Sequence, residues 1–433
     1  MAVVAPAPPI SRPVPQPAAP PGRQPAPPPA GRHAVGDPRS AGSAPSSARA
    51  PRDPFVDAVR AIGTLGVVLL HWLMAEAARD GTTLRVGNAL GHGGAWILTW
   101  AQPLALLFFA AGASAAYQRL ATVTAGRGWG GVFVGRFRAT ARPVGAFVAA
   151  WGVGVAALLA AGVPDDAVWR MARMAPQLLW FLAVWVALMA LTPVLQAAWR
   201  RWRWGALGVA VALPLAVDGL RFGLPGEPTA VLAWANVILA WAAPFLAGVA
   251  YATERAAGRR PGAVRAARTR GHRVPAADGR AGHLLLAVGV VAGLAAAAAL
   301  VAVGPYPPSM IGLPGDEISN LGPPTAPVVA HAVALVCAAL LARDAVVRRA
   351  SSRRGRRVVA SLAGRSMTVY LWHLTAMFTV VGVALLGLGQ QLPAAWGADW
   401  WASRPVWFAA YLLVLLVLVR LFGRFEDRPR RVL

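Results

Sequence analysis

The chain has 433 residues, of which 57% are hydrophobic and only 14% are charged, and its mean hydropathy is +0.52. Soluble proteins carry about 25% charged residues, so this composition excludes an ordinary soluble protein and indicates a membrane protein with many spans. The net charge of +25 comes from arginine alone, because the sequence contains no lysine. These arginines cluster between apolar runs, so we attribute the charge to membrane orientation rather than to nucleic-acid binding.

The first 52 residues are rich in proline, alanine, serine and glycine and contain no apolar stretch. They lack the hydrophobic segment of a signal peptide. We expect residues 1–52 to form a disordered cytoplasmic tail with polyproline-II character, and we favour a passive tail over one that binds a partner. At the other end, we expect residues 426–433 to form a short basic cytoplasmic tail.

Residues 53–425 are predicted to form one membrane domain. This region contains about ten apolar segments that are long enough to span a bilayer. The predicted fold class is therefore all-α, a polytopic transmembrane helix bundle. The second and ninth segments are long enough to be kinked or partly outside the bilayer, and the fifth contains Asp218 and Arg221. The segments are 56–77, 93–118, 141–162, 177–197, 204–222, 231–252, 283–304, 325–343, 358–387 and 406–423.

The distribution of arginine predicts the orientation of this bundle. Of 42 arginines, 35 lie in or beside the N-terminal tail, the even-numbered connections between spans and the C-terminal tail. Six lie in or beside the odd-numbered connections. Cytoplasmic loops carry an excess of basic residues, so both termini are predicted to be cytoplasmic. Many of the 18 tryptophans lie near predicted span ends, as in an interfacial aromatic belt.

The first predicted span carries polar side chains along one face. Arg60 and His71 are eleven residues apart. At about 100° per residue this is roughly 20° beyond three turns, so both lie on one face, about 16 Å apart along the axis. Asp57, Thr64 and Val67 fall on the same stripe. Ionisable groups at membrane depth are costly and usually functional, so the stripe is predicted to line a site. The alternative is that Arg60 is an anchor paired with Asp57 and that His71 packs between helices.

Other common sites have no support in the sequence. The single cysteine, Cys337, excludes an intrachain disulfide, and no cluster of cysteine and histidine has metal-ligand spacing. We expect no metal and no bound cofactor. No phosphate-binding loop, dinucleotide fingerprint or serine-hydrolase elbow occurs in a suitable context. No internal repeat is evident, which argues against an inverted-repeat transporter.

Several segments resemble, in order, the acyltransferase-3 family of integral membrane O-acyltransferases. Arg60 and His71 have the spacing of the arginine and histidine in the family's first membrane helix. The resemblance covers approximately residues 52–425. Later helices of the family are similar to QPLALLFFAAGASAAY, PQLLWFLAVWVALMALTP and MTVYLWHL. The basic segment before the family's third helix is similar to GRFRATARP. A segment of actinobacterial members is similar to SNLGPPT.

The resemblance implies that an acyl group, often acetyl, moves from cytoplasmic acyl-CoA to a hydroxyl of a cell-envelope carbohydrate or similar acceptor, in a bacterial plasma membrane. His71 would be a general base or a transient acyl carrier. Arg60, Arg138 and Arg142 would bind the CoA phosphates, for which guanidinium offers bidentate contacts. The family often has two arginines, three residues apart, before its third helix. This sequence differs, because Arg136, Arg138 and Arg142 are spaced by two and four residues. The pantetheine arm is about as long as the rise from Arg60 to His71.

Residues in the later spans are further candidates. Tyr370 and His373, in the ninth span, are predicted to line the site, with helix packing as the alternative. His331 in the eighth span is assigned to packing.

The connection before the eighth span carries possible acceptor-binding residues. Asp316, Ser319 and Asn320 could hydrogen-bond a sugar, and a solvated loop is the alternative. Two other functions also stay open. One is a transporter of a glycan or lipid intermediate whose path is lined by Arg60 and His71. The other is a non-catalytic scaffold whose proline-rich tail recruits partners.

Overall fold

The computed structural model describes residues 53–80, 83–224, 231–258, 279–313 and 315–427. The predicted N-terminal tail and most of the predicted C-terminal tail lie outside these residues. The longer helices are α1 (Pro54–Leu73), α2 (Leu104–Thr124), α3 (Trp129–Ala160), α5 (Leu179–Ala190), α7 (Trp204–Gly223), α9 (Asn236–Gly258), α11 (Arg280–Val303), α12 (Ala326–Leu341), α15 (Ser366–Gly382) and α16 (Ala398–Phe422). Shorter helices are α4 (Asp165–Met174), α6 (Thr192–Trp202), α13 (Arg343–Ser351) and α14 (Arg353–Gly364).

Helices that could cross a membrane dominate the described chain. Nine helices or joined helices among the described residues are long and apolar enough to span a bilayer. The pair α12 and α13, bent by 57°, would make ten if it counts as one span. This confirms the prediction of an all-α, polytopic transmembrane bundle of about ten spans.

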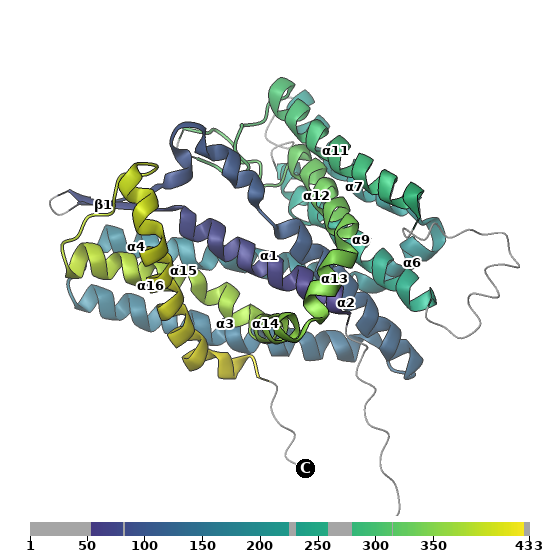
Figure 1. Cartoon of the computed structure of the whole chain (residues 1–433), viewed down its shortest axis with the longest axis horizontal. Coiled ribbons are helices and arrows are strands. Elements are labelled where there is room, and N and C mark those ends of the chain that lie inside the picture. The colour runs from purple at the N-terminus through teal and green to yellow at the C-terminus, as the bar shows by residue number, and fades with distance from the viewer. Residues whose placement is uncertain (1–52, 81–82, 225–230, 259–278, 314, 428–433) are drawn as a thin grey trace, which may run out of the picture. The chain divides into compact units, whose positions relative to one another are not determined.

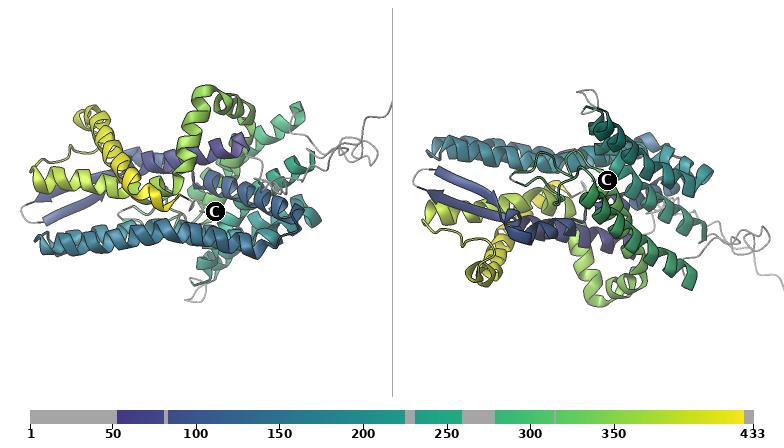
Figure 2. Two further views of the ribbon diagram at one scale, coloured as in Figure 1. Left: turned by 90° about the horizontal axis from the view of Figure 1, so that it is seen from below. Right: turned by 90° about the horizontal axis from the view of Figure 1, so that it is seen from above.

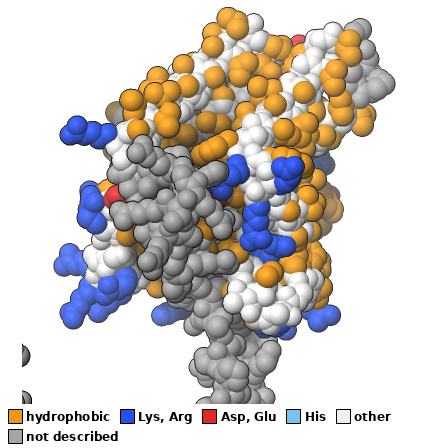
Figure 3. All heavy atoms as spheres, turned by 90° about the vertical axis from the view of Figure 1, so that its right-hand side faces the viewer, with side chains coloured by type: hydrophobic (Ala, Val, Ile, Leu, Met, Phe, Trp, Pro, Cys, Tyr) orange, Lys and Arg blue, Asp and Glu red, His pale blue; other side chains and the backbone are white. Residues whose placement is uncertain are grey.

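Helix α1 runs through the middle of the bundle (Figure 1). It contacts α2 on one side and α13, α14 and α15 on others. Helices α2 and α9 also bury most of their spans, whereas α3 and α11 leave most of their apolar side chains exposed. We expect these exposed helices to face lipid. Figure 3 shows arginine side chains on the lower and left parts of one face, and hydrophobic side chains over its upper part.

Glycines set the spacing of the two most closely packed helices, α2 and α9. A Cβ atom built on Gly112 would lie 2.0 Å from the backbone oxygen of Phe245, and one built on Gly248 would lie 2.0 Å from that of Phe109. The two backbones therefore approach more closely than any side chain would allow. Small residues are typical of such contacts between membrane helices. This crossing holds α2, which contacts α1, against α9.

Two predicted spans are broken in the structure. The ninth segment, 358–387, is long enough to be kinked, and in the structure its first residues belong to α14 and a new helix begins at Ser366. The carboxylate of Glu426 accepts hydrogen bonds from the backbone N–H groups of Met367 and Thr368, at 3.2 and 2.9 Å. These N–H groups have no partner within a helix that starts here, so Glu426 stabilises the break. In segment 93–118, a 3-10 helix, η3 (Gly93–Ala101), ends before Pro103 and α2 follows.

A β-hairpin occupies the first predicted connection. Strands β1 (Ala75–Asp80) and β2 (Thr83–Asn88) pair antiparallel, with Ala75 opposite Asn88. Both views in Figure 2 place this hairpin beside the ends of α3 and α15. It is the only strand pair among the described residues outside one isolated bridge. The Asp-Gly pair that begins at Asp80 is a local hairpin signal in the sequence, which a search for helical periodicity does not detect.

Helix α7, the predicted fifth span, accommodates its acidic residue by burying it among donors. The Asp218 carboxylate, 2% exposed, accepts hydrogen bonds from Asn236 Nδ2 at 3.0 Å, the Tyr306 hydroxyl at 3.1 Å and the backbone N–H of Ala326 at 2.6 Å. Burial and the adjacent carboxylate raise the pKa of Tyr306, which lies in the loop after α11, so its hydroxyl stays protonated and donates. The carboxylate thus ties α7 to α9, α12 and the loop between α11 and α12.

Candidate active site

Two histidines from distant parts of the chain lie side by side inside the bundle. His71 is in the last turn of α1 and His373 is within α15, 302 residues later, and Nδ1 of His71 is 3.3 Å from Nε2 of His373. Their ring centroids are 5.0 Å apart. His373 is fully buried, whereas His71 is only half-buried. Of the two residues, only His71 has exposed surface.

Backbone carbonyls determine which nitrogen of each neutral ring carries the proton. His71 Nδ1 is 2.8 Å from the carbonyl oxygen of Val67, and His373 Nδ1 is 2.7 Å from that of Tyr370. A carbonyl oxygen only accepts, so we assign a proton to Nδ1 of both rings. Nε2 of His373 can then accept the Nδ1–H of His71, and Nε2 of His71 keeps its lone pair. In this tautomer His71 can take a proton from a hydroxyl or attack a carbonyl carbon.

Neighbouring side chains hold His373 in place. The indole Nε1 of Trp72 donates to the backbone oxygen of His373 at 3.1 Å. One turn earlier on α15, the Tyr370 hydroxyl donates to the backbone oxygen of Leu178 at 2.9 Å. Leu178 ends the short 3-10 helix η4 (Ala175–Leu178). The structure thus places Tyr370 and His373, both predicted to line the site, on one turn that is fastened to α1 and to η4.

Arg60 lies three turns before His71, near the start of α1. Its Nη1 is 3.5 Å from Asp57 Oδ1, and its Nη2 donates to the hydroxyl of Ser114 on α2. The side chains of Arg60 and Asp57 are 28% and 27% exposed, so the guanidinium is held on two sides but remains accessible. Thr64, between Arg60 and His71 on the same face, is buried. The predicted stripe is therefore accessible at its two ends and closed by packing in the middle.

The start of α1 is fixed by a buried carboxylate. Asp53 caps the helix by accepting from the backbone N–H of Phe55 at 3.0 Å, and its other oxygen accepts from the hydroxyls of Tyr117 at 2.8 Å and Tyr251 at 3.2 Å. Arg343 Nε in turn donates to the Tyr251 hydroxyl at 3.2 Å. The cluster joins α1, α2, α9 and α13 two turns from Arg60. Asp followed by Pro is a local helix-start signal, but the two tyrosines could not be assigned from the sequence.

The arginines at the start of α3 differ in their environments. Arg138 and Arg142 are exposed, and no hydrogen bond joins either of them to Arg60 within the described residues. Arg136 is half-buried and its Nε donates to Gln118 Oε1 on α2 at 2.8 Å. Donor binding by Arg138 and Arg142 stays a prediction.

The polar residues predicted for the acceptor bond within their own loop. Asn320 is fully buried, and its Nδ2 donates to the backbone oxygens of Pro307 at 2.7 Å and Ser309 at 2.8 Å. Asp316 accepts from the Ser309 hydroxyl at 3.0 Å, and Ser319 accepts from the backbone N–H of the second residue after it at 3.1 Å. These side chains shape the loop, and contact with an acceptor stays a prediction.

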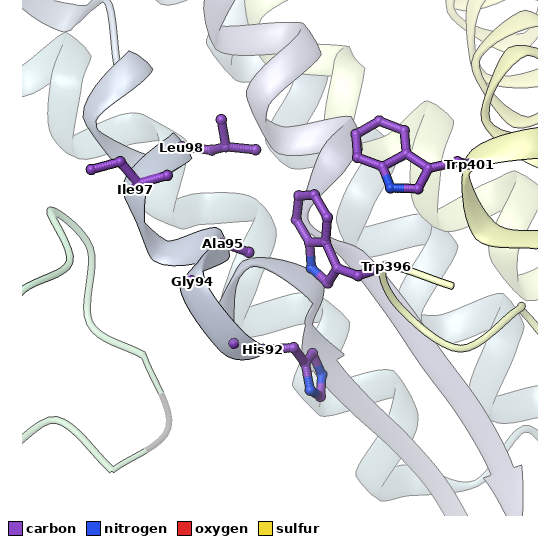
Figure 4. Close-up of a pocket in the computed structure, with 8 residues that line it drawn as sticks. His92, Gly94, Ala95, Ile97, Leu98, Trp396 and Trp401 are labelled. Carbon is purple, nitrogen blue, oxygen red and sulfur yellow. The ribbon is translucent and has the colours of Figure 1, made fainter. Parts of the chain in front are cut away.

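An apolar groove opens at the end of the bundle where η3 meets the segment before α16. Figure 4 shows Trp396 and Trp401 facing the η3 residues across it. The Trp396 ring is fastened by a hydrogen bond from its Nε1 to the backbone oxygen of Ala89. Its φ of 68° is a left-handed conformation that a bulky side chain rarely adopts. The groove is lined by His92, Gly93, Gly94, Ala95, Ile97, Leu98, Trp396 and Trp401.

The comparison with protein families identifies the whole region that carries these residues. Residues 53–425 match the acyltransferase-3 family, described as an acyltransferase domain. The chain belongs to this family. It is thus an integral, multi-pass membrane acyltransferase that transfers an acyl group other than aminoacyl. No curated protein and no solved structure matches the chain.

In this acyltransferase, the paired histidines come from opposite ends of the matched region. His71 is in its first helix and His373 is in its penultimate long helix. Membership of the family implies an acceptor with a hydroxyl, and the enzyme works within a lipid bilayer. An accessible imidazole beside a buried one is chemistry that acyl transfer to a hydroxyl can use.

Proposed function

We propose that this acyltransferase moves an acyl group, in the first instance acetyl, from acyl-CoA to a hydroxyl of a cell-envelope carbohydrate in a bacterial plasma membrane. The contact between His71 and His373 is the observation that carries the proposal. Because Nδ1 of His71 is engaged by Val67 and His373, Nε2 is the nitrogen of this ring left to act as a base. The accessible Arg60 at the other end of the stripe supports binding of the donor on the predicted cytoplasmic side.

In the proposed reaction, Nε2 of His71 takes the proton of the acceptor hydroxyl. The hydroxyl oxygen attacks the thioester carbonyl carbon, the carbon–sulfur bond breaks, and the leaving CoA thiolate takes the proton back from His71. His373 keeps His71 in the required tautomer by accepting its Nδ1–H. The carboxylate of a serine-hydrolase triad orients its histidine in the same way, but here the partner is a neutral ring. In the alternative route, Nε2 of His71 attacks the thioester carbonyl carbon and the CoA thiolate leaves. The acceptor hydroxyl then attacks the acyl carbon, the carbon–nitrogen bond breaks, and the hydroxyl proton passes to the thiolate.

Arg60 is proposed to bind the donor. Its two tethers, Asp57 and Ser114, orient the guanidinium and leave further N–H groups for phosphate or amide oxygens of CoA. Arg138 and Arg142 would add charge for the CoA phosphates from α3. Because Thr64 is buried, a donor arm that follows the stripe to His71 must displace the helices packed there.

The test supplies membranes with acetyl-CoA labelled in its acetyl group and compares the wild type with His71→Ala. We expect label on a carbohydrate acceptor to fall by about 10²- to 10⁴-fold, as for loss of a general base. His283→Ala is the matched control, because this histidine is exposed on α11 and should leave labelling unchanged.

Equal labelling by the wild type and His71→Ala would end the catalytic assignment of His71. A quench before acceptor is added separates the two routes. Label on the protein that depends on His71 supports the acyl-histidine, and unlabelled protein supports the general base.

A further inference from the structure

Arg404 is a buried cation whose end groups have no partner among the described residues. It lies in α16 and is only 5% exposed. Its Nε donates to the backbone oxygen of Trp400 at 3.1 Å, one turn earlier in the same helix. The other two nitrogens, Nη1 and Nη2, are buried and make no hydrogen bond with the residues that the structure describes. Burying a guanidinium in this way is costly unless an anion or acceptor is supplied.

An arginine that only anchors its helix in the membrane would extend its guanidinium to the membrane surface. Arg404 is about 9 Å from the start of α16 along its axis, close enough for an arginine to extend to the membrane surface. Instead, its guanidinium lies over the Trp400 ring, 4.3 Å from the centroid. The side chain is thus turned into the protein rather than towards the membrane surface. This placement points to a ligand rather than to anchoring.

A second unpaired group lies on the same face of α16. The hydroxyl of Tyr411, two turns after Arg404, is buried without a hydrogen-bond partner among the described residues. The Tyr411 ring is 5.4 Å from that of Trp72, which directly follows His71. Tyr411 therefore packs against the part of α1 that carries His71.

A stack of aromatic rings links Arg404 to the groove between η3 and α16. The Arg404 guanidinium lies over the ring of Trp400. That ring stacks on Trp396, with centroids 4.9 Å apart, and contacts Trp401 edge-on at 4.8 Å. Trp396 and Trp401 form one wall of the groove (Figure 4). The groove therefore adjoins the ring on which the Arg404 guanidinium lies, although Arg404 itself does not line it.

We propose that Arg404, assisted by the Tyr411 hydroxyl, binds an anionic oxygen group, a phosphate or carboxylate, on the predicted outer side of His71. The planar fork of Nη1 and Nη2 fits two oxygens of one such group. The anion is either part of a soluble molecule, such as an acceptor, or the headgroup of an anionic lipid. The site is separate from Arg60, and it does not depend on the reaction proposed above.

The experiment measures the melting temperature of the full chain in nanodiscs. One arm titrates sodium phosphate at constant ionic strength with phosphatidylcholine as the lipid. The other replaces phosphatidylcholine by phosphatidylglycerol without phosphate. A ligand that binds the folded state raises the melting temperature, and we expect a rise of about 2–4 °C here. Arg404→Gln should lose this rise, and Tyr411→Phe should lose part of it.

Arg85→Gln is the matched control, since Arg85 is an exposed arginine of β2 paired with Asp80, and it should keep the wild-type response. A response to phosphate that depends on Arg404 supports a soluble anion, and one to phosphatidylglycerol supports a lipid headgroup. The proposal is overturned if neither anion stabilises the wild type, or if Arg404→Gln responds as the wild type does. If Arg404→Gln does not fold, Arg404→Lys decides, because it keeps the charge without the fork. A reduced response of Arg404→Lys supports the site, and an unchanged one overturns it.

Discussion

At the scale of single residues, the decisive feature is the environment of one nitrogen atom, Nδ1 of His71. The carbonyl of Val67 and Nε2 of His373 both lie within hydrogen-bonding distance of it. Both are acceptors, so they favour the same tautomer. The half-buried His71 is thereby prepared to act through Nε2, and its buried partner performs no chemistry on the substrate.

A pair of substitutions at His373 tests this positioning role. His373→Gln keeps an amide acceptor near Nδ1 of His71, whereas His373→Leu removes it. Loss of one hydrogen bond in a buried site costs about 1–3 kcal/mol, so kcat of His373→Leu should fall at least about fivefold below that of His373→Gln. The KM for the donor should not change, because Arg60 is three turns away.

The two variants are compared by their kcat and donor KM, measured at saturating acceptor. Their melting temperatures check that both are folded. Equal kcat values would show that His373 only packs against His71. A matching rise in the donor KM would instead indicate general disruption of α15.

At the scale of elements, close packing between α2 and α9 positions the donor end of the site. Ser114, which holds Arg60, follows Gly112 by two residues on α2. Any separation of the two helices would therefore move Ser114 relative to Arg60. Glycine at the crossing is required for space rather than for an unusual backbone conformation.

Replacing a glycine at this crossing should destabilise the bundle. In Gly248→Ala the new methyl would meet the backbone oxygen of Phe109, which cannot rotate away as a side chain does. Overpacking of this kind typically costs about 1–3 kcal/mol. We expect a lower melting temperature of the purified full chain, together with a weakened donor affinity.

Gly152→Ala in α3 is the matched control, because nothing lies within 4 Å of its Cβ position. Alanine favours helix over glycine by up to about 1 kcal/mol, so this variant should melt at the same or a higher temperature. If both variants melt alike, the close approach of α2 and α9 does not limit stability.

At the scale of the whole molecule, arginine divides the bundle into two ends. The Arg60 end of α1 adjoins α13 and α14, which carry many arginines, whereas the His71 end adjoins the hairpin and the groove. The positive-inside rule assigns the first end to the cytoplasm. Donor and acceptor would then approach the same helix from opposite sides of the membrane.

Cysteine labelling of intact cells tests this orientation. The only native cysteine is replaced first, in Cys337→Ala, and a single cysteine is then introduced in Arg85→Cys or in Arg357→Cys. An impermeant maleimide should label the first variant in intact cells, and the second only after permeabilisation. The reverse pattern would invert the predicted topology and move the donor site to the outer side.

The sequence by itself determined the features that depend on neighbours along one helix. Apolar length predicted the spans, with Tyr370 and His373 in the ninth, and a rotation of about 100° per residue placed Arg60 and His71 on one face. The length of segment 358–387 allowed a kink, but local signals did not place the break before Ser366, because the carboxylate that stabilises it, on Glu426, is far away in the chain.

Only the tertiary structure decided which of these groups meet. His71 and His373 are 302 residues apart, and their contact depends on how α1 packs against α15. Asp53 and its two tyrosines come together for the same reason, as do Arg60 and Ser114. The isolation of Arg404 is likewise a tertiary property, since an unpaired donor can be recognised only when everything around it is in place. Periodicity describes one helix at a time, whereas the chemistry of this acyltransferase arises between helices.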